Sequence, residues 1–91
     1  MTRCVQMELG EVRHVRIQVR NLNGKEFTIS NAKYELKGQF EADIESSGEC
    51  MIQEHVIDAY ISPKQKGDYY LTYTYNIGDE TLVDVIKIRV V

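Results

Sequence analysis

Apolar and polar residues alternate along most of this chain, and turn residues interrupt the alternation roughly every eight to twelve positions. Such alternation is typical of strands that bury one face. The first two segments place an apolar residue at every second position: Val5, Met7 and Leu9, then Val15, Ile17 and Val19. Gly10-Glu11 separates these segments, and Asn21-Leu22-Asn23-Gly24 predicts a hairpin turn because Asn-Gly accepts positive φ angles.

Changes of parity inside the later segments predict bends or turns. Phe27 and Ile29 share one parity, whereas the next apolar residues share the other, so we expect a bulge at Ser30-Asn31. A second change near Gln53-Glu54 separates Cys50 and Ile52 from the apolar residues that follow. The alternating residues after these two changes are Ala32, Tyr34 and Leu36, then Ile57, Ala59 and Ile61.

The middle and the end of the chain continue the same pattern. Phe40, Ala42 and Ile44 predict a strand, Ser46-Ser47-Gly48 a turn, and Ser62-Pro63 the close of the segment that follows. A long strand is expected over 68–77, then a turn at Ile77-Gly78-Asp79-Glu80 and a last strand over 81–91. The apolar parity of this last strand shifts between Val85 and Ile86.

These elements predict an all-β fold, an immunoglobulin-like β-sandwich of about seven or eight short antiparallel strands. The 91 residues fit one domain, 1–91, and show no helical period and no internal repeat. Two Phe, six Tyr and many Val, Ile and Thr residues agree with strands.

Charge and cysteine content narrow the classes of partner. A net charge of −3 and a pI near 5.3 argue against nucleic acid. The first residues contain no apolar signal segment and no run is long enough to cross a membrane, so we expect a cytoplasmic protein without membrane contact. Cys4 and Cys50 are therefore expected as reduced thiols, the alternative being a disulfide in an exported protein.

The most specific motif is Pro63-Lys64-Gln65-Lys66-Gly67-Asp68-Tyr69-Tyr70-Leu71, a proline turn followed by Gly-x-Tyr at the start of a strand. In immunoglobulin-like sandwiches a Tyr at this corner bonds nearby backbone and fixes the crossover between the sheets. We assign this structural role to Gly67 and Tyr69, with the hydroxyl bonded near Pro63 or Lys64. A ligand-stacking Tyr69 is the alternative, but Leu71 shares its face and marks that face as inward.

A family resemblance rests on this corner and three further segments: Phe27-Thr28-Ile29, Ala32-Lys33-Tyr34-Glu35-Leu36 and Ile77-Gly78-Asp79-Glu80. The chain resembles small Ig-like domains of phage and prophage virion proteins, among them the N-terminal domain of baseplate upper proteins in phages of Gram-positive bacteria. The resemblance implies a structural role without catalytic residues, in a protein made in the cytoplasm and incorporated into a phage particle.

Charge is distributed unevenly along the chain. A basic stretch without acids contains Arg13, Arg16, Arg20 and Lys25, and an acidic stretch without bases contains Glu41, Asp43, Glu45, Glu49, Glu54 and Asp58. We favour cross-strand pairs within one sheet, worth about 0.2–1 kcal/mol each. The alternative is an interface between proteins or between copies, as in a homo-oligomer, with the contacts Arg16, Arg20, Glu41, Asp43 and Glu45.

Catalytic, metal and cofactor sites are not indicated by the sequence. His14 and His55 are isolated, and Cys4 and Cys50 lack a closely spaced second thiol. We therefore expect a non-catalytic structural or adaptor module that acts through protein–protein contacts with itself or with virion-like proteins. The alternative is a small-ligand or carbohydrate-binding module, for which the aromatic candidates are Tyr34, Tyr60 and Tyr70.

Overall fold

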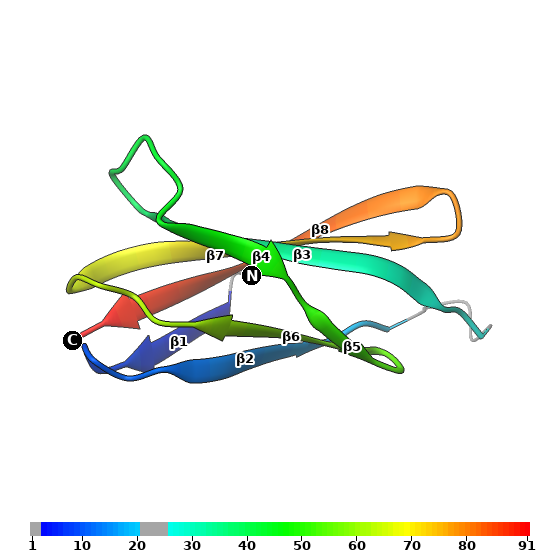
Figure 1. Ribbon diagram of the computed structural model, residues 1–91, viewed down its shortest axis with the longest axis horizontal. Helices are drawn as coiled ribbons and strands as arrows, with labels where there is room; N and C mark the ends of the chain where they lie inside the picture. Colours follow the sequence, from blue (N-terminus) through cyan, green and yellow to red (C-terminus); the bar gives the residue numbers. More distant parts are fainter. Residues whose placement is uncertain (1–2, 21–25) are drawn as a thin grey trace.

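The computed structural model describes residues 3–20 and 26–91, which form two β-sheets packed face to face (Figure 1). The fold is therefore an all-β, immunoglobulin-like sandwich, as the alternation predicts. The strands in chain order are β1 (Arg3–Met7), β2 (Arg13–Gln18), β3 (Ile29–Gly38), β4 (Ser46–Glu49), β5 (Met51–Gln53), β6 (Val56–Ile61), β7 (Gly67–Ile77) and β8 (Glu80–Val90). The predicted turn at 21–24 lies outside the described residues.

The larger sheet has the strand order β1-β8-β7-β3-β4, and the smaller sheet has the order β2-β6-β5. Neighbouring strands are antiparallel except β1 and β8, which pair in parallel from Arg3 beside Ile86 to Met7 beside Val90. The expectation of a wholly antiparallel sandwich is wrong at this edge. Because β1 pairs with the last strand and not with β2, it extends the larger sheet and leaves β2 as an edge of the smaller one.

The core lies between the sheets and comes from every second residue of the strands. β7 contributes its inward face, and strands on both sides complete the apolar layer. The inward residues of β7 are Tyr69, Leu71, Tyr73 and Tyr75; the other buried apolar residues are Met7, Val15, Ile17, Val19, Ile29, Ala32, Leu36, Ile57, Ala59, Ile61, Ile86, Ile88 and Val90.

Two predicted parity changes correspond to distinct structures. The pairing of β3 with β7 shifts register between Ile29 and Asn31, which confirms the expected bulge. The change near Gln53 is a two-residue hairpin turn at Glu54-His55, where Glu54 has a φ of 54°. The turn at Gly78-Asp79 also forms as predicted, with Gly78 at a φ of 60°.

Three predicted segments differ from the structure. Residues 39–45 form a loop instead of a strand, and Ser46–Glu49 forms β4 instead of a turn. The pairing of β7 with β8 is continuous, so the shift of apolar parity between Val85 and Ile86 marks no bulge or bend. Val83 and Val85 lie exposed on the outer face of the larger sheet, while Ile86 continues the inward face.

Candidate functional site

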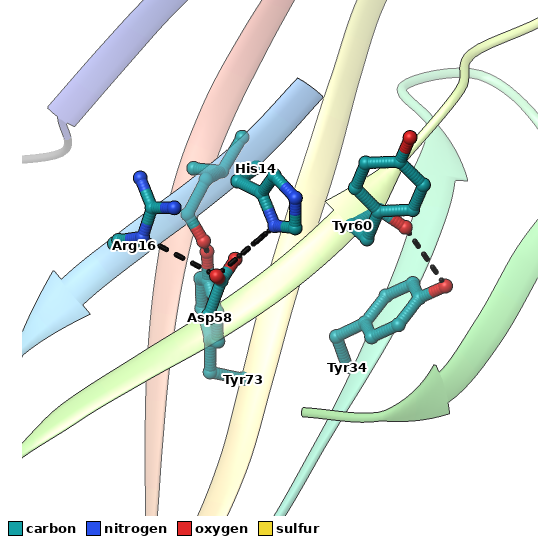
Figure 2. A network of polar contacts seen from close by, with 7 residues as sticks. His14, Arg16, Tyr34, Asp58, Tyr60 and Tyr73 are labelled. Carbon is teal, nitrogen blue, oxygen red and sulfur yellow. Dashed lines mark hydrogen bonds and ion pairs between the residues drawn. The ribbon is translucent and has the colours of Figure 1, made fainter. Parts of the chain in front are cut away.

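A polar network on the outer face of the smaller sheet joins β2 to β6 (Figure 2). Arg16 lies directly opposite Asp58, and its Nε is 3.2 Å from Asp58 Oδ2. His14 Nδ1 lies 3.0 Å from the same carboxylate, and the His14 ring packs against Tyr60 with centroids 4.4 Å apart. Asp58 is thus paired within the sheet, which confirms for Arg16 the cross-strand interpretation of the charge pattern.

Two tyrosines link this network to the larger sheet. The hydroxyl of Tyr73, at the centre of the core, donates to the Val15 carbonyl oxygen at 2.6 Å. Burial raises the pKa of Tyr73 far above its ordinary value. The Tyr34 hydroxyl donates to the Tyr60 carbonyl oxygen at 3.3 Å, as Figure 2 shows. These contacts fix the distance between the sheets and give the network a structural role.

The Tyr69 corner joins three segments at one end of the sandwich. Tyr69 is 4% exposed, and its hydroxyl donates to Glu45 Oε1 at 2.9 Å. The same hydroxyl accepts from the Gln65 backbone N–H at 3.2 Å, one residue beyond the predicted partner Lys64. The Lys64 N–H instead donates to Glu45 Oε2 at 3.3 Å. The carboxylate of Glu45, a predicted interface residue, therefore accepts hydrogen bonds within the chain.

Gly67 begins β7 with a φ of 128°, a conformation that L side chains rarely adopt. A Cβ atom at this position would meet no atom within 4 Å, so backbone conformation alone favours glycine here. Burial, and then the hydrogen bond to Glu45, raises the pKa of Tyr69. The corner therefore depends on an un-ionised hydroxyl and on the backbone of Gly67.

The same end of the sandwich contains a hollow of about 640 Å³. We call this region the corner end and define it by the turn 9–10, the loop 39–45, the loop 62–66 and Val91. Backbone bonds hold these parts together: Leu9 N–H donates to Val91, and Gln39 N–H donates to Asp68. Residues of the loop 39–45 line the hollow together with Lys66, Arg89 and Val91.

Exposed apolar side chains gather at the corner end. Of the eleven large hydrophobic residues exposed in the described part of the chain, four lie there: Leu9, Phe40, Ile44 and Val91. Phe40 is 92% exposed and Ile44 is 48% exposed. Alternation assigned both residues to a core face and therefore did not indicate this surface. Its only sequence mark is the acidic setting of Glu41, Asp43 and Glu45.

The predicted interface residues do not form one cluster. Arg16 is paired with Asp58, whereas Glu41 and Asp43 are exposed in the loop 39–45. Arg20 is exposed beyond the far end of β2, because β2 starts at the corner end with Arg13 beside Ile61. Within residues 3–20 and 26–91, Arg20, Glu41 and Asp43 form no ion pair.

The tyrosines considered for sugar binding do not converge on one surface. Tyr60 projects from the outer face of the smaller sheet, beside His14. Tyr70 lies on the outer face of the larger sheet, beside Lys37 and Lys87. Tyr34 is half-buried between β4 and β6. A stacking platform shared by the three rings is therefore not available in this fold.

Metal ligands, thiols and membrane-spanning helices were the remaining features to locate in the part of the chain that the structure describes. It holds no group of three or more His, Cys, Asp or Glu residues placed to bind a metal ion. Cys4 and Cys50 are free thiols, and burial raises the pKa of Cys50 to about 11. None of the described segments is a helix long and apolar enough to span a membrane.

Asp68, on the outer face near the hollow, forms ion pairs with β8. Its carboxylate lies 3.1 Å from Arg89 Nε and 3.5 Å from Lys87 Nζ. The hydrogen bond from Arg89 is the main cause that holds the pKa of Asp68 below its ordinary value. Because the pKa of Asp68 is lower in the folded state, its carboxylate stabilises the fold fully above the pKa of the unfolded chain, which is about 4. This stabilisation is lost as the pH falls through the lower pKa of the folded state.

We therefore predict that Asp68→Asn lowers the melting temperature at neutral pH and that this difference shrinks as the pH falls below about 4. Melting curves from circular dichroism between about pH 7 and pH 2.5 measure both quantities. Glu35→Gln, on the same outer face, is the matched control, because Glu35 forms no ion pair with another described residue. A difference that stays constant across this range would contradict the prediction.

Comparisons with known proteins support the fold and identify no family or function. No protein-family model matches the chain, and no curated protein matches it in sequence. The crystal structure of an engineered protein superposes with a TM-score of 0.75 at 13% identity, over 99% of this chain and 18% of that one. An endo-β-1,4-mannanase from Thermotoga petrophila superposes with a TM-score of 0.63 at 15% identity, over 96% of this chain and 17% of that one. The chain thus spans under a fifth of the length of either protein.

Proposed function

We propose that this chain is a non-catalytic structural or adaptor module that acts by protein–protein contact through its corner end. The observation that carries the proposal is that three exposed apolar residues, Phe40, Ile44 and Val91, line the hollow, with Phe40 almost fully exposed. Contiguous apolar surface with a polar rim is typical of protein interfaces. The acidic residues Glu41 and Asp43 supply such a rim.

Two further observations support a contact module. The polar groups on the smaller sheet and at the Tyr69 corner have partners within the fold, which agrees with a structural role for them. The two similar structures carry this fold as less than a fifth of a longer chain, as expected for a module. The resemblance to virion domains makes a phage or prophage particle the setting that we propose.

Light scattering tests this function on the protein alone and mixed with the products of neighbouring genes. We expect a mass above the 10.5 kDa of one chain, either for the protein itself or for one of the mixtures. Phe40→Ser should weaken the complex by about tenfold or more, as for a central contact residue. Val83→Ser is the matched control, because Val83 is 58% exposed but lies far from the corner end.

A small-ligand or carbohydrate-binding module is the second candidate, because the hollow falls within the size range of about 300–1,000 Å³ of ligand pockets. Isothermal titration with a panel of oligosaccharides tests it. A defined sugar that binds in the hollow of a chain that forms no complex with itself or with a neighbouring protein would replace the contact module by this second function.

A further inference from the structure

Hydrogen bonds hold both ends of the loop 39–45, which carries the exposed Phe40. The loop is bonded at its start by Gln39 N–H to the Asp68 carbonyl and at its end by Glu45 N–H to the Leu36 carbonyl. The Glu45 side chain adds the bonds at the Tyr69 corner. Figure 1 shows the loop standing away from the body of the sandwich. Because the ends of the loop are already held, less backbone entropy is lost when the loop binds a partner, which favours its use as a contact.

The hollow beside this loop has an excess of negative charge. Four acids line it, Glu41, Asp43, Glu45 and Asp68, against the two bases Lys66 and Arg89. Arg89 is already paired with Asp68, and Glu45 is bonded at the corner. Glu41 and Asp43 therefore remain as exposed carboxylates next to Phe40 and Ile44, against one exposed lining cation, Lys66.

Acidic residues also predominate at the opposite end of the sandwich, as far as residues 3–20 and 26–91 describe it. Asp79 and Glu80 lie at the turn between β7 and β8, and Glu54 lies at the turn between β5 and β6. Among the described cations, Arg20 is exposed just beyond the end of β2. Copies stacked end to end would place acids against acids, which disfavours binding by like-charge repulsion.

We infer that the corner end binds a basic segment of another protein, whose apolar side chain enters the hollow. Phe40 and Ile44 supply the apolar contacts, and Glu41 and Asp43 attract the cations on either side. The inference rests on the proposed function and adds the chemistry of the partner. Charge at the rim of an interface chiefly sets specificity and association rate, whereas a central aromatic residue supplies much of the affinity.

Three short peptides test this chemistry by NMR titration of the ¹⁵N-labelled chain. One carries a single leucine between lysines, the second replaces the lysines by glutamates, and the third replaces the leucine by serine. We expect the first alone to shift the amide signals of Phe40, Ile44 and Val91. Phe40→Ser should weaken its binding by about tenfold, and raising the salt to about 0.5 M should weaken it as well.

Paired variants separate this inference from the proposed function. Glu41→Lys with Asp43→Lys should abolish binding of the lysine peptide and create binding of the glutamate peptide, while Val83→Ser leaves both unchanged. Shifts from the serine peptide equal to those from the leucine peptide would overturn the inference, as would no shift from any peptide at millimolar concentration. A self-complex through Phe40 that ignores the charge reversal would overturn the inference but keep the contact module.

Discussion

Replacing Tyr73 by alanine is expected to lower the free energy of unfolding by about 3–5 kcal/mol. Tyr73 is fully buried at the centre of β7 and contacts the layer formed by both sheets. Removing its ring leaves a cavity that the surrounding core residues cannot fill without moving their strands. Urea unfolding monitored by circular dichroism measures the change.

Tyr73→Phe separates the hydroxyl from the ring. The variant keeps the packing but removes the donor to the Val15 carbonyl, so we expect a loss of about 0.5–1.5 kcal/mol. Tyr70→Phe is the matched control, because Tyr70 lies on the same strand but faces outward. Equal effects of Tyr73→Phe and Tyr70→Phe would show that the bond between the sheets contributes nothing to stability.

The inward faces of most strands could be predicted from the sequence, because a strand that buries one face must alternate. The residues of β7 show this directly, since Tyr69, Leu71 and Tyr73 all face the core. Turn chemistry located Gly78-Asp79 correctly, and the parity change at Ser30-Asn31 located the bulge. Each of these features depends on residues close together in the sequence.

Features that depend on strand pairing could not be predicted in this way. Phe40, Ala42 and Ile44 alternate like a strand, but β3 pairs with Ser46–Glu49. Gly48 suits this pairing, because a Cβ atom there would lie 3.2 Å from the Tyr34 ring, closer than an ordinary contact. Nothing local in Ser46-Ser47-Gly48 indicates the close approach of a ring twelve or more residues away.

The candidate site was predicted only in part, for the same reason. The uneven charge distribution indicated cross-strand pairs, and Arg16 with Asp58 is one. The motif at Gly67 and Tyr69 indicated a corner, but the Glu45 contact requires the fold of the loop 39–45. The exposed surface around Phe40 follows from that loop as well, so no alternation argument could reveal it.

Truncating Tyr69 to alanine is expected to cost about 3–5 kcal/mol, close to the effect at Tyr73. The Tyr69 ring is buried between the sheets, and its hydroxyl links the loops 39–45 and 62–66 through Glu45 and Gln65. Removing only the hydroxyl, in Tyr69→Phe, should cost about 0.5–1.5 kcal/mol. Urea unfolding of both variants gives these values.

A double-mutant cycle with Tyr69→Phe and Glu45→Ala tests whether the corner works as described. Glu45→Ala removes the acceptor of the Tyr69 hydroxyl and of the Lys64 N–H, so the two substitutions remove a shared bond. We expect a coupling energy of about 0.5–1.5 kcal/mol between them, because residues in one hydrogen-bond network are not additive. The matched cycle uses Glu41→Ala, since Glu41 lies in the same loop without contacting the hydroxyl, and should give additive effects. Additivity in both cycles would mean that Tyr69 stabilises the corner through its ring alone, and that the loop carrying Phe40 is held by its backbone bonds.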